Sequence, residues 1–161
     1  MDGVDRLIFL LVVAAKLVTA ADERSLICER EQVFAQALKT KDQVVLSALT
    51  EKDFYVSWTE DSVERTVTTE EHREAWIDDV IHLQMDAYKT TISDVRLIKR
   101  KGAETVAGAV VTLEESWIIR SPRGSRVEKH FLTTDFWFQL SGAWKLTQRE
   151  CRSSWPYLRL P

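Results

Sequence analysis

The stretch TTDFWFQLSGAWKLTQ, residues 133–148, predicts a β-hairpin. Aromatic and β-branched residues fill both arms, and the Ser141-Gly142 pair between them has the composition of a two-residue turn. Such a turn fixes the register, because each residue before it then faces a defined residue after it. The expected pairs are Leu140 with Ala143, Gln139 with Trp144, Trp137 with Leu146, and Asp135 with Gln148.

Two faces follow from this register, because alternate residues of a strand point to the same side. The first face has the composition of a cavity wall: Asp135, Trp137, Trp144, Leu146 and Gln148. The second face is mixed: Phe136, Phe138, Lys145 and Thr147. We therefore expect Asp135 to point inward, and we expect Phe136 and Phe138 to lie outside, at the contact of a homodimer.

The overall composition fits one globular domain preceded by a targeting segment. The chain has 161 residues, of which 45% are hydrophobic, which is enough for a sizeable core. Its 22 basic and 25 acidic residues are well mixed and give a net charge of −3. No basic stripe stands out, so the sequence argues against nucleic acid as the main partner.

The N-terminus has an apolar run, LIFLLVVAA at residues 7–15, followed by small residues that fit a signal-peptidase site. We interpret residues 1–20 as a signal peptide cleaved after Ala20, which predicts a periplasmic or secreted protein. The acidic residues before the run and Lys16 after it are atypical of a signal peptide. The alternative is an N-terminal helix of a cytoplasmic protein. The run is shorter than the roughly twenty residues that a membrane span needs.

Apolar periodicity predicts three helices in the first half of the chain. The first covers residues 23–39, and the second begins after Asp42, which suits an N-cap. The third begins at a capping box formed by Thr68 and Glu71 and ends near residue 83. The stripe expected on the buried face of the first helix is Leu26, Ile27, Arg30, Val33, Phe34, Ala37 and Leu38.

Strands account for most of the remainder. A short hairpin is expected between the second and third helices, at residues 53–58 and 63–67. Four long strands follow, at residues 88–100, 104–120, 126–140 and 144–152. A change of parity between Ile92 and Val95 predicts a β-bulge. Segregated helices and antiparallel strands indicate an α+β fold, in which long bent strands wrap over helices and leave a cavity.

The order of these elements and three motifs resemble the nuclear transport factor 2-like superfamily, specifically its SnoaL-like group of small bacterial domains. The motifs are ALKTKDQVVLSALTEKDFYVSW, TTEEHREAW and TTDFWFQLSGAWKLTQRE. The resemblance implies a cone: a curved antiparallel sheet wrapped over three N-terminal helices, with the domain at 21–153 and a C-terminal tail at 154–161. The superfamily includes isomerases, cyclases, dehydratases, epoxide hydrolases and non-catalytic domains, so the resemblance identifies no single activity.

Asp135 is the main candidate for chemistry. An acid among tryptophan rings has its pKa raised by desolvation, and a raised pKa suits a general base near neutral pH. Tyr55 could then serve as an oxyanion donor, and His72, one turn before Trp76, could assist. The alternative is that Asp135 is ionised and is held by an arginine or by backbone donors as a structural element.

Four residues are candidates for ligand contacts: Trp58, Trp76, Trp137 and Gln148. Either Glu114 or Glu115 must face inward, because neighbours in a strand alternate. No pattern of metal-ligand spacing is present, so we predict no metal and no cofactor. The two cysteines, Cys28 and Cys151, are compatible with one disulfide or with two free thiols.

Two functions of different classes remain open at the level of sequence. The first is a domain that binds a small apolar or aromatic molecule in an aromatic-lined pocket of the cone. The alternative is a cofactor-free acid–base enzyme, of isomerase, cyclase or dehydratase type, that uses Asp135. A dimerisation module with a filled cavity is the third possibility.

Overall fold

The computed structural model describes residues 20–161 except 63, 103–104, 122, 155–157 and 160–161. The predicted signal peptide, apart from Ala20, lies outside the described residues, so cleavage and export stay predictions. Within the described part of the chain, no helix is both long enough and apolar enough to cross a membrane.

The order of elements is the one expected from the sequence. The described residues form three helices: α2 (Ala20–Thr40), α3 (Gln43–Leu49) and α4 (Arg73–His82). The strands are β1 (Thr50–Asp61), β2 (Thr66–His72), β3 (Met85–Lys99), β4 (Val106–Arg120), β5 (Arg126–Leu140), β6 (Ala143–Ser154) and β7 (Leu158–Arg159).

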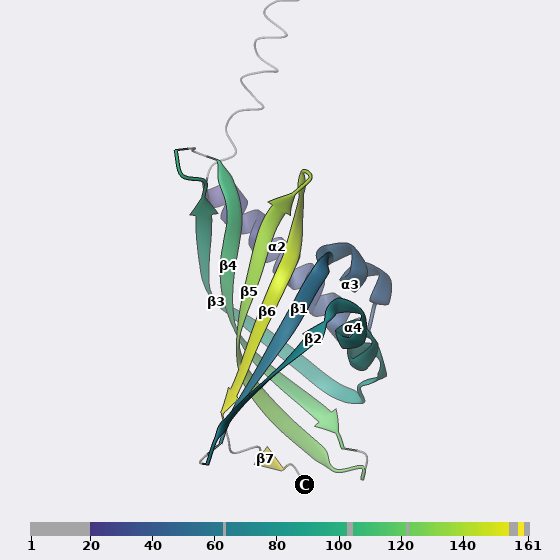
Figure 1. Ribbon diagram of the computed structural model, residues 1–161. Coiled ribbons are helices and arrows are strands. Elements are labelled where there is room, and N and C mark those ends of the chain that lie inside the picture. The colour runs from purple at the N-terminus through teal and green to yellow at the C-terminus, as the bar shows by residue number, and fades with distance from the viewer. Residues whose placement is uncertain (1–19, 63, 103–104, 122, 155–157, 160–161) are drawn as a thin grey trace, which may run out of the picture.

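The strands form one curved sheet with the order β2-β1-β6-β5-β4-β3. Figure 1 shows the long strands sweeping across the molecule, with α2 behind the sheet and with α3 and α4 at the side of β1 and β2. This arrangement confirms the α+β cone. The sheet is mixed, because β1 pairs with β6 in parallel, whereas the other neighbours are antiparallel. β7, within the expected tail, pairs with the start of β5.

The β5–β6 hairpin confirms the predicted turn and the first part of the register. Ser141 and Gly142 have φ values of 50° and 81°, as a type I′ turn requires. Trp137 lies opposite Leu146, as predicted, but a β-bulge follows between Phe136 and Trp137. The predicted pairing beyond this point is wrong: Asp135 lies opposite Arg149, and Gln148 lies opposite Phe136.

Two other local predictions are confirmed. Strand β3 has an irregularity between Ile92 and Asp94, within the stretch where a bulge was expected. The Asp42 side chain accepts a hydrogen bond from the backbone N–H of Val45 at 3.0 Å, so it is the N-cap of α3.

The capping box predicted for the third helix is wrong. Thr68 and Glu71 belong to β2, where they pair with Thr59 and Val56 of β1. The helix begins after His72, whose side chain makes no capping hydrogen bond. The ladder with β1 extends the strand through residues whose local pattern favours a helix start.

The buried face of α2 confirms the predicted stripe in part, because Ile27, Phe34, Ala37 and Leu38 are buried as expected. Ile27, Glu31, Phe34 and Leu38 are buried, whereas Val33 is 48% exposed. Their spacing of four, three and four residues keeps them on one side of the helix. An acid, Glu31, therefore points into the core from the middle of α2.

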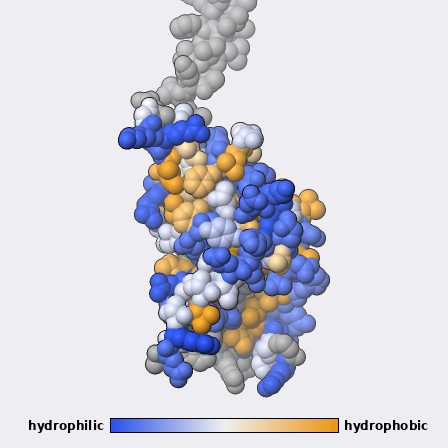
Figure 2. Space-filling model, in the orientation of Figure 1, coloured by the Kyte–Doolittle hydropathy of each residue, from blue (hydrophilic) through white to orange (hydrophobic). Residues whose placement is uncertain are grey.

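The outer face of the sheet carries a row of apolar side chains. Phe136 and Phe138 lie half-buried on β5, and Leu132 and Leu140 on the same face are exposed. The ring of Phe138 rests on Gly108, where an added Cβ would lie only 2.8 Å from it. Figure 2 shows apolar atoms gathered over the upper part of β4 and β5 on this face.

Candidate functional site

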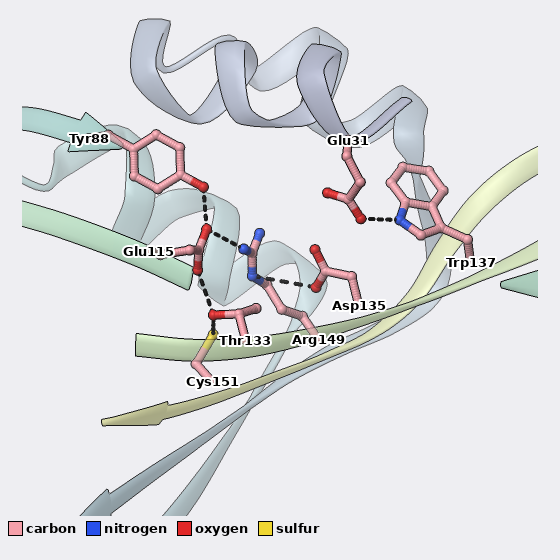
Figure 3. Close-up of polar contacts among 8 residues, drawn as sticks. All are labelled: Glu31, Tyr88, Glu115, Thr133, Asp135, Trp137, Arg149 and Cys151. Atoms are coloured by element: carbon pink, nitrogen blue, oxygen red, sulfur yellow. Dashed lines mark hydrogen bonds and ion pairs between the residues drawn. The ribbon is translucent and has the colours of Figure 1, made fainter. Parts of the chain in front are cut away.

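A cluster of charged side chains lies between α2 and the sheet, away from solvent. We call Glu31, Glu115, Asp135 and Arg149 the buried acid cluster; none of them is more than 3% exposed. Figure 3 shows Glu31 projecting from α2 toward the sheet, with its carboxyl group beside that of Asp135. The other members come from β4, β5 and β6, so the cluster joins four elements.

Glu115 and Arg149 form the tightest pair of the cluster. Nη2 of Arg149 donates to Oε1 of Glu115 at 2.5 Å. The Tyr88 hydroxyl donates to the same oxygen, and the Thr133 hydroxyl donates to Oε2 at 2.6 Å. Three donors from three different strands therefore converge on this one carboxyl group. The expectation that Glu114 or Glu115 faces inward is therefore met by Glu115.

Asp135 points inward as predicted, and it faces both a cation and a second acid. Its Oδ1 lies 3.6 Å from Nε of Arg149. Burial raises the pKa of Asp135 well above its usual range, and the neighbouring Glu31 and Glu115 act in the same direction, against Arg149. Burial and the two neighbouring acids therefore favour the protonated form of Asp135, whose carboxyl group lies beside that of Glu31.

Glu31 accepts a hydrogen bond from Nε1 of Trp137 at 2.5 Å. Burial raises the pKa of Glu31 to about 7, although Arg149 and the hydrogen bond from Trp137 oppose the rise. The buried acid cluster thus has one cation, Arg149, for three acids. Protonation, rather than further ion pairs, offsets the remaining negative charge.

The cysteines do not add reactivity to the cluster. Both Cys28 and Cys151 are free thiols in the structure. Burial raises the pKa of Cys151 to about 12, so its thiol stays neutral, and its sulfur lies 3.7 Å from the hydroxyl oxygen of Thr133. A neutral buried thiol is a poor nucleophile and a poor metal ligand.

A separate cavity of about 360 Å³ lies among β1, β2, α4, β4 and β5. We call it the aromatic cavity, because rings form much of its wall. Its lining residues are Trp58, Thr59, Glu60, Val67, Thr69, Glu71, Trp76, Asp79, Val80, Leu83, Trp117, Ile119, Lys129 and Phe131. The apolar part of the wall is what a small apolar molecule would contact.

Three rings of this wall hold one another in place. Trp58, Trp117 and Phe131 meet edge to face, with ring centroids 5.5–6.1 Å apart. The ring of Tyr88 packs on Trp117 at 5.5 Å, and its hydroxyl reaches Glu115. One aromatic layer therefore lies between the aromatic cavity and the buried acid cluster.

Only two of the four residues predicted to contact a ligand line the aromatic cavity. Trp58 and Trp76 line the aromatic cavity. Trp137 is fully buried against Phe34 and Glu31, and it does not line this cavity. Gln148 lies beyond the bulge on the outer face, where it donates to Glu150 at 2.6 Å.

The two residues expected to assist Asp135 do not approach it. Tyr55 lies between the inward-facing Phe54 and Val56 of β1, so it points to the opposite, outer side. It pairs with His72 on β2 and with Gln148 on β6. These three predicted residues thus form one row across the outer face.

Sequence reasoning missed several residues of both sites. Glu31 lies on the helical spacing of Ile27, Phe34 and Leu38, and this pattern was the available signal. Trp117 lies on the face of Glu115, two residues along β4. Arg149 had no such signal, because its direction depends on the bulge.

Metal binding finds no support in the part of the chain that the structure describes. Among those residues, no group of three or more His, Cys, Asp or Glu side chains is placed to hold an ion. His130 is exposed and lies 3.4 Å from Glu128.

Comparison with solved structures identifies the fold of the protein, whereas comparison of sequences finds no match. No protein-family model matches the sequence, and no curated protein matches it. An NTF2-like protein from Cytophaga hutchinsonii has a TM-score of 0.59 at 17% identity, over 81% of this chain and 97% of that one. An NTF2-like protein of unknown function from Silicibacter pomeroyi has a TM-score of 0.58 at 13% identity, over 84% and 99%.

The protein has the NTF2-like fold. This result confirms the architecture that the resemblance implied. An enzyme shares the fold: LinA type 2, a hexachlorocyclohexane dehydrochlorinase, has a TM-score of 0.58 at 11% identity, over 86% of this chain and 89% of that one. Similarity at such identities concerns the fold and carries no activity from one protein to the other.

The first prediction concerns Arg149. We expect Arg149→Gln to lower the free energy of unfolding by about 3–5 kcal/mol, because it leaves buried acids without their cation. The control is Arg152→Gln on the same strand, where the side chain is 64% exposed and pairs with Asp61 at 2.6 Å. That change should cost at most about 1 kcal/mol. Chemical denaturation measures both, and equal losses would contradict a stabilising role for the buried pair.

The second prediction concerns pH. The native state holds a proton on Glu31 up to a pKa of about 7, whereas the unfolded chain releases it near 4.5. Stability from this group is therefore complete below pH 4.5 and is lost as pH rises through 7. The loss should reach about 3 kcal/mol. Glu31→Gln removes this titration and should flatten the decline, which denaturation at a series of pH values measures.

The control for that experiment is Glu29→Gln, an exposed position on the same helix. This variant should keep the pH dependence of the wild-type protein. The assignment would be contradicted if the stability of the wild-type protein were constant or rose with pH across the interval between the two pKa values.

Proposed function

We propose that this protein binds a small, largely apolar molecule in the aromatic cavity. The observation that carries the proposal is a cavity of about 360 Å³ with Trp58, Trp117 and Phe131 in its wall. Ligand pockets of soluble proteins start at roughly this size and combine apolar walls with a few polar groups. The rings in the wall already contact one another, so a ligand would meet a preformed surface.

The polar groups of the cavity would orient the ligand. Glu71 accepts a hydrogen bond from Nε1 of Trp58 at 3.1 Å, and Lys129 lies 3.5 Å from Glu60. Thr69 on β2 adds a hydroxyl group to the lining. These side chains come from the strands, which gives them fixed positions on rigid elements.

Acid–base catalysis is the second candidate, and one observation favours it. A smaller pocket of about 220 Å³ includes Glu31 and Tyr88 in its lining. A carboxyl group with a pKa of about 7 is suited to exchange protons near neutral pH. Asp135 is fully buried behind Glu31, so in this alternative it would act through Glu31 rather than on a substrate.

Binding without chemistry is the better supported of the two. Asp135 and Glu31 do not line the aromatic cavity, and the aromatic layer separates them from a molecule bound there. The cluster also has a structural role, since Glu115 accepts a hydrogen bond from the buried guanidinium of Arg149 and Asp135 lies 3.6 Å from it. Tyr55 and His72, the other catalytic candidates, lie on the outer row.

The third prediction tests the binding function. N-Phenylnaphthylamine, an uncharged probe that fluoresces in apolar surroundings, should bind to the wild-type protein in a 1:1 ratio. Ile119→Trp places a larger side chain into the cavity that Ile119 lines, so it should weaken uptake of the probe by about tenfold or more. Fluorescence titration measures the dissociation constants.

Ile118→Trp is the matched control, because this half-buried neighbour points to the opposite face of β4. It should leave uptake unchanged. The proposal fails if the wild-type protein does not take up the probe. It also fails if both tryptophan variants bind the probe equally well while remaining folded by circular dichroism.

The fourth prediction concerns the homodimer that we expect from the sequence. The apolar row on the outer face of β5, at Leu132, Phe136, Phe138 and Leu140, supports this proposal. Sedimentation velocity should give the mass of a dimer. Phe136→Glu should give a monomer, because it places a charge in an apolar contact. A wild-type protein that sediments as a monomer at high concentration would exclude the dimer.

A further inference from the structure

We propose that the ligand of the aromatic cavity is an organic cation, with an amine or quaternary ammonium group on an apolar body. This inference rests on the proposed function and adds the charge of the ligand to it. The argument comes from the charged side chains among the lining residues, which are Glu60, Glu71, Asp79 and Lys129.

The acids outnumber the single base of this set by two. Nζ of Lys129 lies 3.5 Å from Oε1 of Glu60, so these two charges offset each other. Among the described residues, neither Glu71 nor Asp79 forms an ion pair with a lysine, an arginine or a histidine. The cavity therefore presents two carboxylates to a bound molecule without a protein cation of their own.

Asp79 lies where its own helix disfavours a negative charge. It belongs to the last turn of α4, which ends at His82, and the C-terminal end of a helix dipole is itself negative. Asp79 nevertheless lines the cavity together with Val80 and Leu83. A cation in the cavity would relieve this repulsion.

Glu71 is held in place beside an indole ring. Its Oε2 accepts the hydrogen bond from Nε1 of Trp58, which ties the carboxylate to the aromatic wall. Cations are attracted to the faces of tryptophan and phenylalanine rings, and this attraction grows when water is excluded. Trp58, Trp117 and Phe131 in the wall therefore act in the same direction as the carboxylates.

These features also distinguish between ligand classes. An anion would meet two unbalanced carboxylates and a lysine that is already paired, so it should be rejected. A neutral apolar molecule would gain from the rings but leave the two carboxylates without a cation. A cation with an apolar body uses both.

The test compares three probes that share a phenylbutyl body: phenylbutylamine, phenylbutanol and phenylbutyrate. Quenching of tryptophan fluorescence at neutral pH and low salt measures their dissociation constants. We expect the amine to bind about tenfold more tightly than the alcohol, and the carboxylate to bind most weakly. Added salt should weaken binding of the amine and leave that of the alcohol nearly unchanged.

Variants assign the preference to the cavity. Asp79→Asn combined with Glu71→Gln should bring the amine to within about threefold of the alcohol, because both carboxylate charges are lost. Asp78→Asn is the control: Asp78 is on the same helix, lies outside the lining of the aromatic cavity and pairs with His82 at 3.4 Å. It should leave the preference intact.

The outcomes separate this inference from the function on which it rests. Equal binding of amine and alcohol, or tightest binding of the carboxylate, overturns the cationic ligand and leaves the binding function standing. If none of the three probes binds, both proposals fail. If the double variant with Asp79→Asn and Glu71→Gln still prefers the amine to the alcohol, the inference is also overturned, because other residues would then recognise the positive charge.

Discussion

The burial of Arg149 is the constraint on which the rest of the structure depends. A guanidinium inside a protein is costly unless carboxylates and other polar groups surround it. Glu115 and Asp135 supply that charge from two neighbouring strands, and Glu115 is completed by Tyr88 and Thr133. A slip of one residue in any of these strands would turn one partner to the outer face. The cluster therefore fixes the register of β3 to β6 as well as stabilising the core.

The bulge in the β5–β6 hairpin marks the limit of what the sequence could predict there. The two-residue turn sets the register for the residues next to it, so the inward direction of Trp137 followed from simple alternation. One extra residue on β6 near Thr147 reverses the parity beyond it and brings Arg149 opposite Asp135. Alternation would have placed an arginine at the surface by default. The choice between a structural and a catalytic Asp135 depended on this one residue.

Two predictions about the helices were wrong, the first of them in part, for different reasons: which residues of α2 are buried, and where α4 begins. The predicted stripe of α2 included Val33, which is exposed, and omitted Glu31, which is buried and shares the spacing of Ile27 and Phe34. Its carboxyl group accepts a hydrogen bond from Trp137 and lies beside that of Asp135, and both of these residues are distant in sequence. The start of α4 was displaced because pairing with β1 outweighed a local capping signal. Long strands and their order, which rest on extended periodic patterns, were predicted well.

The aromatic layer connects the buried acid cluster to the wall of the aromatic cavity, although the cluster itself does not line the cavity. The ring of Tyr88 packs against Trp117, which lines the cavity, while its hydroxyl is bound to Glu115 on the other side. Movement of Trp117 away from the cavity would therefore press on a ring that is anchored to a charged network. Phe131 and Trp58 also pack edge to face against the indole ring of Trp117. These side chains contact one another without a ligand, so the ligand that we propose would not have to order them, and the polar core would contribute to its affinity through rigidity rather than through contact.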